Sequence, residues 1–177
     1  MEEIESKIQD NIFLQKSILF DFLARSYYYP FKLIDMDILK GELLEVEEIL
    51  PRICKCQETL DAFLKFKEVV MPIDNYDKLT QLEMQFVNLD KPAFVKYSLY
   101  ESVQKMGYHD LINAMDLKKI FRKYGMEPAK GEFPDHISLL LSFLSYLYLR
   151  LSINFEEKIV KDLEDFKKKH IYNWIPK

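Results

Sequence analysis

Glycine is scarce in this chain, and its scarcity excludes more folds than any other single feature. Only four of the 177 residues are glycine: Gly41, Gly107, Gly125 and Gly131. A glycine-rich phosphate loop needs several neighbouring positions without a Cβ, so neither the dinucleotide-binding pattern nor the P-loop pattern is present. Hairpin dipeptides such as Asn-Gly and Asp-Gly are also missing, which argues against a β-sandwich or a barrel.

Prolines divide the chain into segments whose apolar residues repeat with the period of an α-helix. In the first segment Ile4, Ile8 and Ile12 are each four residues apart, and this spacing places them on one helix face. We expect six or seven helices. They cover residues 4–29, 39–46, 60–70, 79–89, 111–124, 134–149 and 155–172. The sequence therefore predicts an all-α fold, a single-domain helical bundle over residues 1–177.

Several boundaries follow from individual residues. Pro51 is expected to separate the second helix from the third, and Gly125 is expected to end the fifth as a left-handed terminator. Pro134 at the first helical position and Asp135 in the first turn are expected to open the most apolar helix. The least periodic stretch, residues 90–107, predicts an extended loop or a broken helix.

Charge and cysteine content limit the partners and the compartment. The net charge is −4 and the pI is near 5.5, so the chain lacks the basic surface that nucleic-acid binding requires. Two cysteines do not make a disulfide framework, which indicates a reducing compartment. The acidic N-terminus is unlike a secretory signal, and the longest apolar run, residues 137–149, is too short to span a bilayer. We expect a cytoplasmic protein without stable membrane insertion.

No set of residues predicts catalysis, a cofactor or a metal site. The three histidines are far apart and none forms an HExxH pair. Cys54 and Cys56 are two residues apart, which favours ordinary packing over zinc or redox chemistry. Ser102, Asp135 and His136 contain the residue types of a hydrolytic triad, but adjacent acid and histidine side chains orient one another poorly.

The stretch 132–137, Glu-Phe-Pro-Asp-His-Ile, permits two interpretations. It is a helix start in which Asp135 favours the helix dipole and His136 is merely tolerated. Alternatively, a titratable histidine and a carboxylate at a helix N-terminus, beside an apolar wall, receive a polar or cationic ligand group. Spacing alone does not decide between them.

The segment EFPDHISLLLSFLSYL resembles the signature of the TorD/DmsD family, which is related to the NarJ group. Other segments resemble the family's further motifs in the same order. Residues 82–86 resemble EYxxLF, 100–103 match YESV, 121–126 resemble YxxxGL, and Phe166, His170, Ile171 and Trp174 match FxxxHLxxW. The resemblance covers roughly residues 10–176.

The resemblance implies an all-helical assembly chaperone rather than an enzyme. Such a protein binds the twin-arginine signal peptide or the N-terminal segment of the catalytic subunit of a molybdopterin-containing oxidoreductase, and holds it until the cofactor is inserted and before export. The alternatives are a NarJ-like chaperone of a non-exported nitrate reductase-type subunit and, third, a nucleotide-binding protein. A signal peptide is basic and then apolar, so its receptor needs an apolar groove with acidic groups at one end.

By motif match, the resemblance assigns peptide binding to seven residues. They are Tyr100, Glu101 and Ser102 on the connecting loop, with Glu132, Pro134, Asp135 and His136 at the start of the PDH helix. We expect Glu101 and Asp135 to supply negative potential, Tyr100 an amphipathic contact, Ser102 a hydrogen bond to backbone, and His136 an orienting or donating group.

Residues elsewhere in the motifs receive structural roles. His170 and Trp174 are expected to dock the last helix, because aromatic residues at a helix end usually pack. Leu140 stands where the family usually has Glu, which removes a charge from the expected binding surface and leaves the client open. The chain is expected to be a monomer or a homodimer.

Overall fold

The computed structural model describes residues 11–27, 35–73, 78 and 98–174. Within these ranges it contains helices and no strand, which confirms the all-α prediction. The helices are α2 (Ile12–Ser26), α3 (Met36–Ile53), α4 (Gln57–Val70), α7 (Glu101–Met106), α8 (Leu111–Lys123), α9 (Ile137–Ile153) and α10 (Glu157–His170). The predicted helix over 79–89 and the N-terminal part of the first helix, residues 4–10, lie outside the described ranges.

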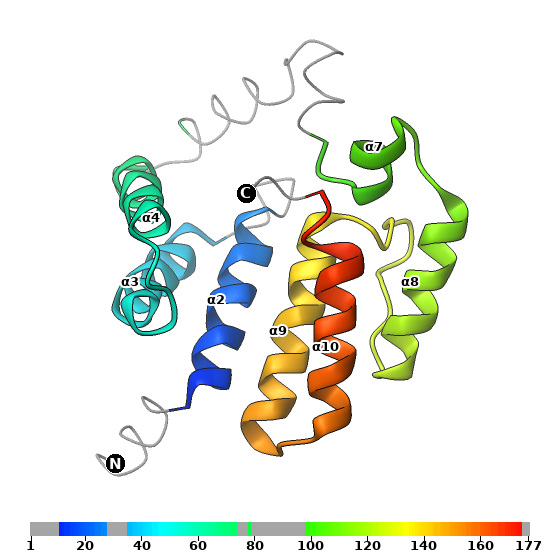
Figure 1. Ribbon diagram of the computed structural model, residues 1–177. Helices are drawn as coiled ribbons and strands as arrows, with labels where there is room; N and C mark the ends of the chain where they lie inside the picture. Colours follow the sequence, from blue (N-terminus) through cyan, green and yellow to red (C-terminus); the bar gives the residue numbers. More distant parts are fainter. Residues whose placement is uncertain (1–10, 28–34, 74–77, 79–97, 175–177) are drawn as a thin grey trace.

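Helix α9 lies at the centre of the bundle, between α2 and α10 (Figure 1). Helices α3 and α4 lie on the far side of α2, and α8 lies on the opposite side of the molecule (Figure 1). Two serines bring α2 and α9 close together. Ser17 Oγ donates to the carbonyl of Ser145 at 2.9 Å, and Ser145 Oγ donates to the carbonyl of Ser17 at 2.9 Å. Small side chains with satisfied hydroxyls thus fix where these helices cross.

Apolar side chains on nearly every face of α9 build the main core. Ten of its residues are buried, and Leu140, Leu144 and Leu147 are fully enclosed. A helix that is apolar all round is expected at the centre of a core. Leu140 belongs to this interior, so the expectation that its exchange removes a charge from the binding surface is wrong. A second core cluster joins α2, α3 and α4 around Phe22 and Leu43.

Local sequence sets where several helices begin. The side chain of Asn11 accepts from the N–H groups of Phe13 and Leu14 at 3.1 and 3.2 Å, and Asp35 and Asp110 cap α3 and α8 in the same way. Such caps satisfy donors that have no partner within the helix. Asn11 also donates to the carbonyl of Ser152 at 3.1 Å, which ties the start of α2 to the end of α9.

Two predicted boundaries are wrong. Helix α3 continues through Pro51 to Ile53, since buried packing along α3 outweighs the hydrogen bond that proline removes near its end. Helix α9 begins at Ile137 with His136 as its N-cap, so Pro134 and Asp135 precede the helix. Residues 101–106 form α7, which agrees with a broken helix over residues 90–107 and places Glu101 and Ser102 in a helix and not on a connecting loop. By contrast, Gly125, with φ of +77°, follows the end of α8 as predicted.

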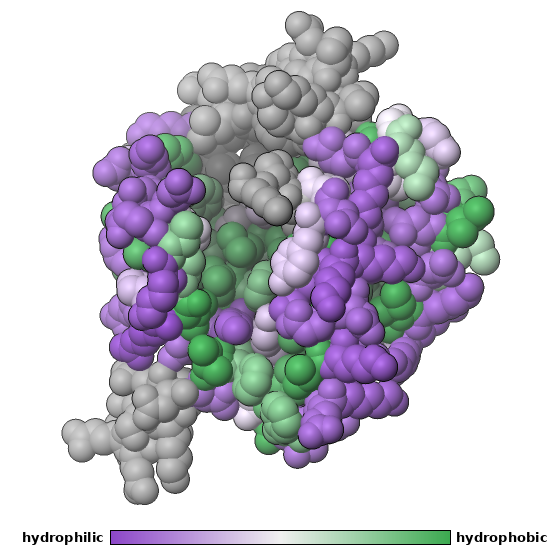
Figure 2. Space-filling model, viewed as in Figure 1, coloured by the Kyte–Doolittle hydropathy of each residue, from purple (hydrophilic) through white to green (hydrophobic). Residues whose placement is uncertain are grey.

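Apolar surface remains exposed beside α2. Figure 2 shows a hollow between the α3–α4 side of the molecule and the α9–α10 side, with green apolar atoms inside it. Helices α2 and α4, with Leu50 of α3, line a cavity of about 370 Å³, whose aromatic lining includes Phe22, Phe63 and Phe66. Cys54 and Cys56, both free, lie in the link between α3 and α4.

Candidate functional site

The YESV and PDH segments pair with each other through their backbones. Tyr100 and His136 form an isolated antiparallel bridge. The N–H of Glu101 donates to the carbonyl of Asp135 at 3.0 Å, and the N–H of Ile137 donates to the carbonyl of Leu99 at 2.7 Å. Because Asp135 is held in this extended pairing, α9 begins two residues later. The two strongest motifs therefore form one structural unit.

Asp135 caps α7 from the other segment of this unit. Its Oδ2 accepts from the N–H of Ser102 at 3.0 Å and also from the Ser102 hydroxyl. Helix α7 has no capping side chain of its own, since its N-cap is Tyr100. A carboxylate at this helix start satisfies a free donor and complements the dipole. The side chain of Asp135 thus contacts Ser102 and not His136. In a hydrolytic triad the histidine lies between the serine and the aspartate, so this arrangement is not a triad.

Glu101 forms a second buried contact, to the end of α10. Its Oε2 lies 2.9 Å from Nδ1 of His170, and its Oε1 lies 2.5 Å from Nζ of Lys105. Both Glu101 and His170 are at most 1% exposed. Burial by itself raises the pKa of Glu101, but the hydrogen bonds and charges of His170 and Lys105 outweigh it and lower that pKa below its ordinary value.

These contacts separate the seven motif-assigned residues into two groups. Glu101, Ser102, Pro134 and Asp135 are buried, and the side chains of Glu101, Ser102 and Asp135 contact one another or neighbouring helices. Tyr100, Glu132 and His136 are partly exposed. The buried group positions the two segments, and the second group forms part of the surface above them.

An aromatic cluster occupies that surface. The ring of Tyr100 meets the rings of His136 and His109 edge-on, with centroids 4.9 and 4.8 Å apart. His109 in turn stacks on Phe133 with centroids 4.4 Å apart. We call Tyr100, His109, Phe133 and His136 the aromatic cluster. Aromatic faces with polar edges bind amphipathic partners well.

Burial favours the neutral forms of two members of the aromatic cluster, His136 and Tyr100. Burial lowers the pKa of His136, against the opposing charges of Glu132 and Asp135. His136 Nδ1 accepts from the N–H of Ser138 at 3.3 Å as the N-cap of α9, and an accepting Nδ1 belongs to a neutral ring. Burial also raises the pKa of Tyr100, and the nearby charges of Asp135 and Glu132 add to this effect.

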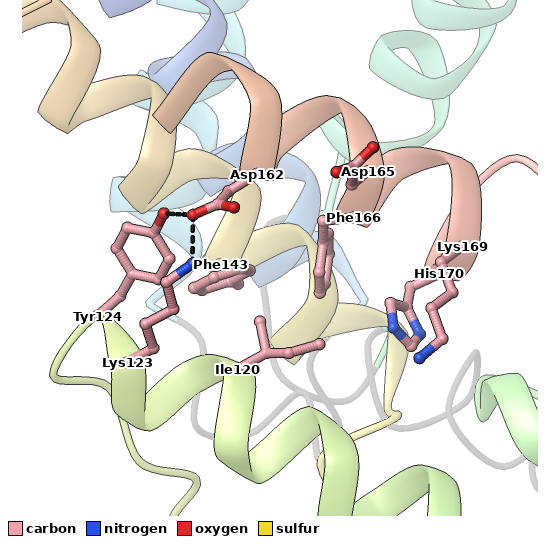
Figure 3. Close-up of a pocket in the computed structure, with 9 residues that line it drawn as sticks. All are labelled: Ile120, Lys123, Tyr124, Phe143, Asp162, Asp165, Phe166, Lys169 and His170. Carbon is pink, nitrogen blue, oxygen red and sulfur yellow. Dashed lines mark hydrogen bonds and ion pairs between the residues drawn. The ribbon is translucent and has the colours of Figure 1, made fainter. Parts of the chain in front are cut away.

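Helix α10 is anchored at two points, and Figure 3 shows the recess between them. In its second turn, Asp162 accepts from the hydroxyl of Tyr124 and pairs with Lys123. At its end lies His170, and Phe143 and Phe166 lie between these two anchors (Figure 3). The recess has a volume of about 160 Å³. It is too small for a peptide segment, so these residues hold α10 in place.

The closing motif consists of Phe166, His170, Ile171 and Trp174, and its His170 and Trp174 were expected to dock the last helix. Trp174 Nε1 donates to the carbonyl of His170 at 2.5 Å, and Trp174 packs against the main core. His170 is buried against Phe166, with ring centroids 5.0 Å apart. Both residues therefore dock the end of α10.

Sequence reasoning missed His109 and Phe133 as members of the aromatic cluster. Phe133 lies in the stretch 132–137, directly before Pro134. Its place beside the matched residues was the one signal in the sequence that could have identified it. His109 follows α7 by three residues, and only the turn at Gly107, with φ of +81°, brings it back to Tyr100. No pattern in the sequence specifies that contact.

Neither a metal site nor a membrane-spanning helix is present among the described residues. No group of histidine, cysteine and acidic side chains there is arranged to hold a metal ion. None of the described helices is both long and apolar enough to cross a bilayer.

Comparison with known proteins gives one match. The model of a protein family described as nitrate reductase delta subunit matches residues 52–177, which include every motif residue of the site above. No curated protein and no solved structure matches the chain.

Proposed function

The chain belongs to the nitrate reductase delta subunit family, and from this premise we propose that it binds the N-terminal segment of a nitrate reductase-type catalytic subunit. Members of the family are chaperones of nitrate reductase assembly and are not enzymes. The chain accordingly has a NarJ-like role in the maturation of a molybdoenzyme. In the proposed cycle it holds the segment in the cytoplasm until the molybdopterin cofactor has entered the subunit.

The observation that supports this proposal is the convergence of three motifs. Two buried contacts join the three motifs: Ser102 to Asp135 across 33 residues, and Glu101 to His170 across 69 residues. The backbone hydrogen bond from Glu101 to Asp135 links these contacts into one network. Buried polar groups are costly unless they are hydrogen-bonded. A satisfied buried network makes the backbone around it rigid. The aromatic cluster lies on this backbone, so the network holds the cluster in a defined shape.

We assign the seven motif residues accordingly. Tyr100, Glu132 and His136 contact the bound segment, with the rings of the aromatic cluster as its apolar floor. Glu101, Ser102, Pro134 and Asp135 are positioning residues, which act by fixing the paired segments beneath.

The test is calorimetry of the full chain with synthetic peptides. The peptides carry the N-terminal segments of the molybdoenzyme catalytic subunits encoded by the same organism. We expect one peptide to bind, and Tyr100→Ala to weaken its binding about tenfold, the loss of a well-packed aromatic contact. Phe155→Ala is the matched control, because Phe155 is 60% exposed at the other end of α9. Failure of every peptide and every cofactor-free subunit to bind would overturn the proposal.

A second experiment identifies the kind of client. Capture of the full chain with its partner from native lysate, followed by sequencing of the captured subunit, shows whether its N-terminus carries a twin-arginine leader. The family match favours a nitrate reductase-type subunit. A captured subunit of another molybdoenzyme, with a leader, would instead favour the export-linked role.

A further inference from the structure

A groove on the surface where α2, α3 and α9 meet has features that the motif site lacks. It has a volume of about 340 Å³, within the range of binding pockets. Its floor is the crossing of α2 and α9 at Ser17 and Ser145, where the paired hydroxyls hold the helices close. Helix α3 forms the opposite wall. Apart from Ser145, which lies within the segment EFPDHISLLLSFLSYL, none of the residues that line this groove belongs to a motif.

The apolar part of the groove comes from α2 and α9. Leu14 and Ile18, one turn apart on α2, line one side, and Leu149 of α9 lines the other. Leu149 is 39% exposed, and Ile153, one turn further along α9, is 79% exposed. Residues four apart lie on one helix face, so apolar surface continues along α9 beyond the groove.

The polar part is acidic. Asp21 of α2 and Glu42 and Glu45 of α3 line the groove. One base is already present, since Arg25 lies 2.7 Å from Asp21 and 3.0 Å from Glu42. Three carboxylates thus face one guanidinium, which leaves the groove negative.

Glu42 has an acceptor that nothing in the described structure satisfies. Its Oε1 pairs with Arg25, while its Oε2 is buried without a hydrogen-bond partner among the described residues. Burial raises the pKa of Glu42, and the charges of Asp21 and Glu45 add to this effect against that of Arg25. A buried unpaired carboxylate oxygen is costly. A further cationic group beside Glu42 would stabilise its charged form, as Arg25 does.

We propose that this groove is the docking site for the basic and apolar part of the client's N-terminal segment. An arginine or lysine of the segment pairs with the accessible carboxylates of Asp21 and Glu45 and lies beside Glu42. Apolar side chains of the segment lie along Leu14, Ile18 and Leu149. The cavity of α2 and α4 is lined without charged residues, so it offers no such complementarity. The inference rests on the proposed function and adds to it a second contact surface, separate from the aromatic cluster.

Calorimetry with the peptide that binds best tests the inference, with substitutions on both partners. We expect Glu42→Gln with Glu45→Gln to weaken binding about tenfold, the typical effect of one lost hydrogen bond to a charged group. The same double substitution should have little effect on a peptide whose basic residues are changed to Gln. Glu48→Gln is the matched control, because Glu48 is exposed on α3 and does not line the groove.

The substitution Arg25→Gln should change the peptide affinity in the opposite direction. Arg25 competes with the peptide for Asp21 and Glu42, and its side chain is 52% exposed. We expect its removal to strengthen binding of the basic peptide about twofold to fivefold, the range for an exposed ion pair. Circular dichroism of each variant confirms that the fold is kept.

A photo-crosslinking residue shows where the peptide lies. Placed at Leu149, it should capture the peptide, whereas at Met115, 60% exposed on α8, it should not. If wild-type protein binds no peptide, the proposed function fails. If wild-type protein binds but the groove variants bind equally well and Leu149 gives no crosslink, the groove inference alone fails.

Discussion

The carboxylate of Asp135 accepts two hydrogen bonds from Ser102, one from its N–H and one from its hydroxyl, across 33 residues of chain. Asp135 is fully buried and its other oxygen, Oδ1, has no partner among the described residues. The aspartate of the PDH motif therefore acts on the YESV motif, and it stabilises α7 from outside that helix.

Asp135→Ala should lower the free energy of unfolding by about 2–3 kcal/mol. The change leaves the N–H and hydroxyl of Ser102 buried without an acceptor, and hydrogen bonds to a charged group are the strong ones. Urea unfolding measures the loss. Ser102→Ala and the double variant complete a cycle, and simple additivity of the two single effects would contradict a direct coupling.

Glu101→Gln should remove stability in a pH-dependent way. The pKa of Glu101 is lower in the folded protein than its ordinary value of 4.5. The ionised carboxylate therefore contributes its full share to the free energy of unfolding above pH 4.5, and this share is lost as the pH falls through the folded pKa. Near neutral pH we expect a loss of roughly 3 kcal/mol, the cost of leaving buried His170 without its partner.

Urea unfolding of wild type and Glu101→Gln over a pH series checks this dependence. The two curves should converge in acid. Glu127→Gln is the control, because Glu127 pairs with Arg122 in solvent at 65% exposure and should change stability little at any pH. A wild-type advantage that persists unchanged into strong acid would argue against an ionised Glu101.

His136 should titrate below 6.5, the ordinary histidine value. Burial disfavours the charged ring and an accepting Nδ1 requires the neutral one. Since the unfolded chain then binds the proton more readily, this residue's contribution to stability is present above pH 6.5 and falls as the pH drops below it. NMR titration of the ring protons measures the midpoint directly, and a value above 6.5 would contradict the cap geometry.

His136→Asn should keep most of the stability that His136→Ala loses. Asparagine provides an N-cap acceptor for the N–H of Ser138, whereas alanine leaves that donor unpaired, at a cost of about 1 kcal/mol. Thermal unfolding of the two variants separates the cap from the aromatic contact with Tyr100, because only the cap is restored by asparagine.

Leu140→Glu should destabilise the protein by about 3 kcal/mol or more, although it restores the residue usual in the resembled family. Leu140 is fully buried in the main core, and a carboxyl group there loses its hydration without a partner. Leu139→Glu is the control, since Leu139 is only partly buried. Equal loss in both variants would show that position 140 is not specially enclosed.

Patterns in the sequence predicted the described helices other than α7, but not all of their ends. Apolar spacing and the caps at Asn11, Asp35 and Asp110 depend on residues close in the sequence. The all-α fold class could therefore be predicted from local sequence alone. Pro51 and the PDH segment were misassigned because packing and strand-like pairing with residues 99–101 overrode local preference.

Motif matching did not predict how deeply the motif residues are buried. The matched segments contain Glu101, Ser102 and Asp135, whose roles in peptide binding stay predictions. They are buried, at 1%, 1% and 0% exposure. Burial depends on what the rest of the chain places over a residue, and spacing within a motif contains no such information.

The sequence by itself determined an all-α bundle and its family, because helical period and short motifs depend on residues close in the chain. Only the tertiary structure decided that Asp135 caps α7, that Glu101 pairs with His170, and that Glu42 lies beside Asp21 in a groove of α2 and α3. These contacts join residues from 21 to 69 positions apart. They form because the burial of apolar helix faces brings the helices together, and the polar groups caught between them must then find partners.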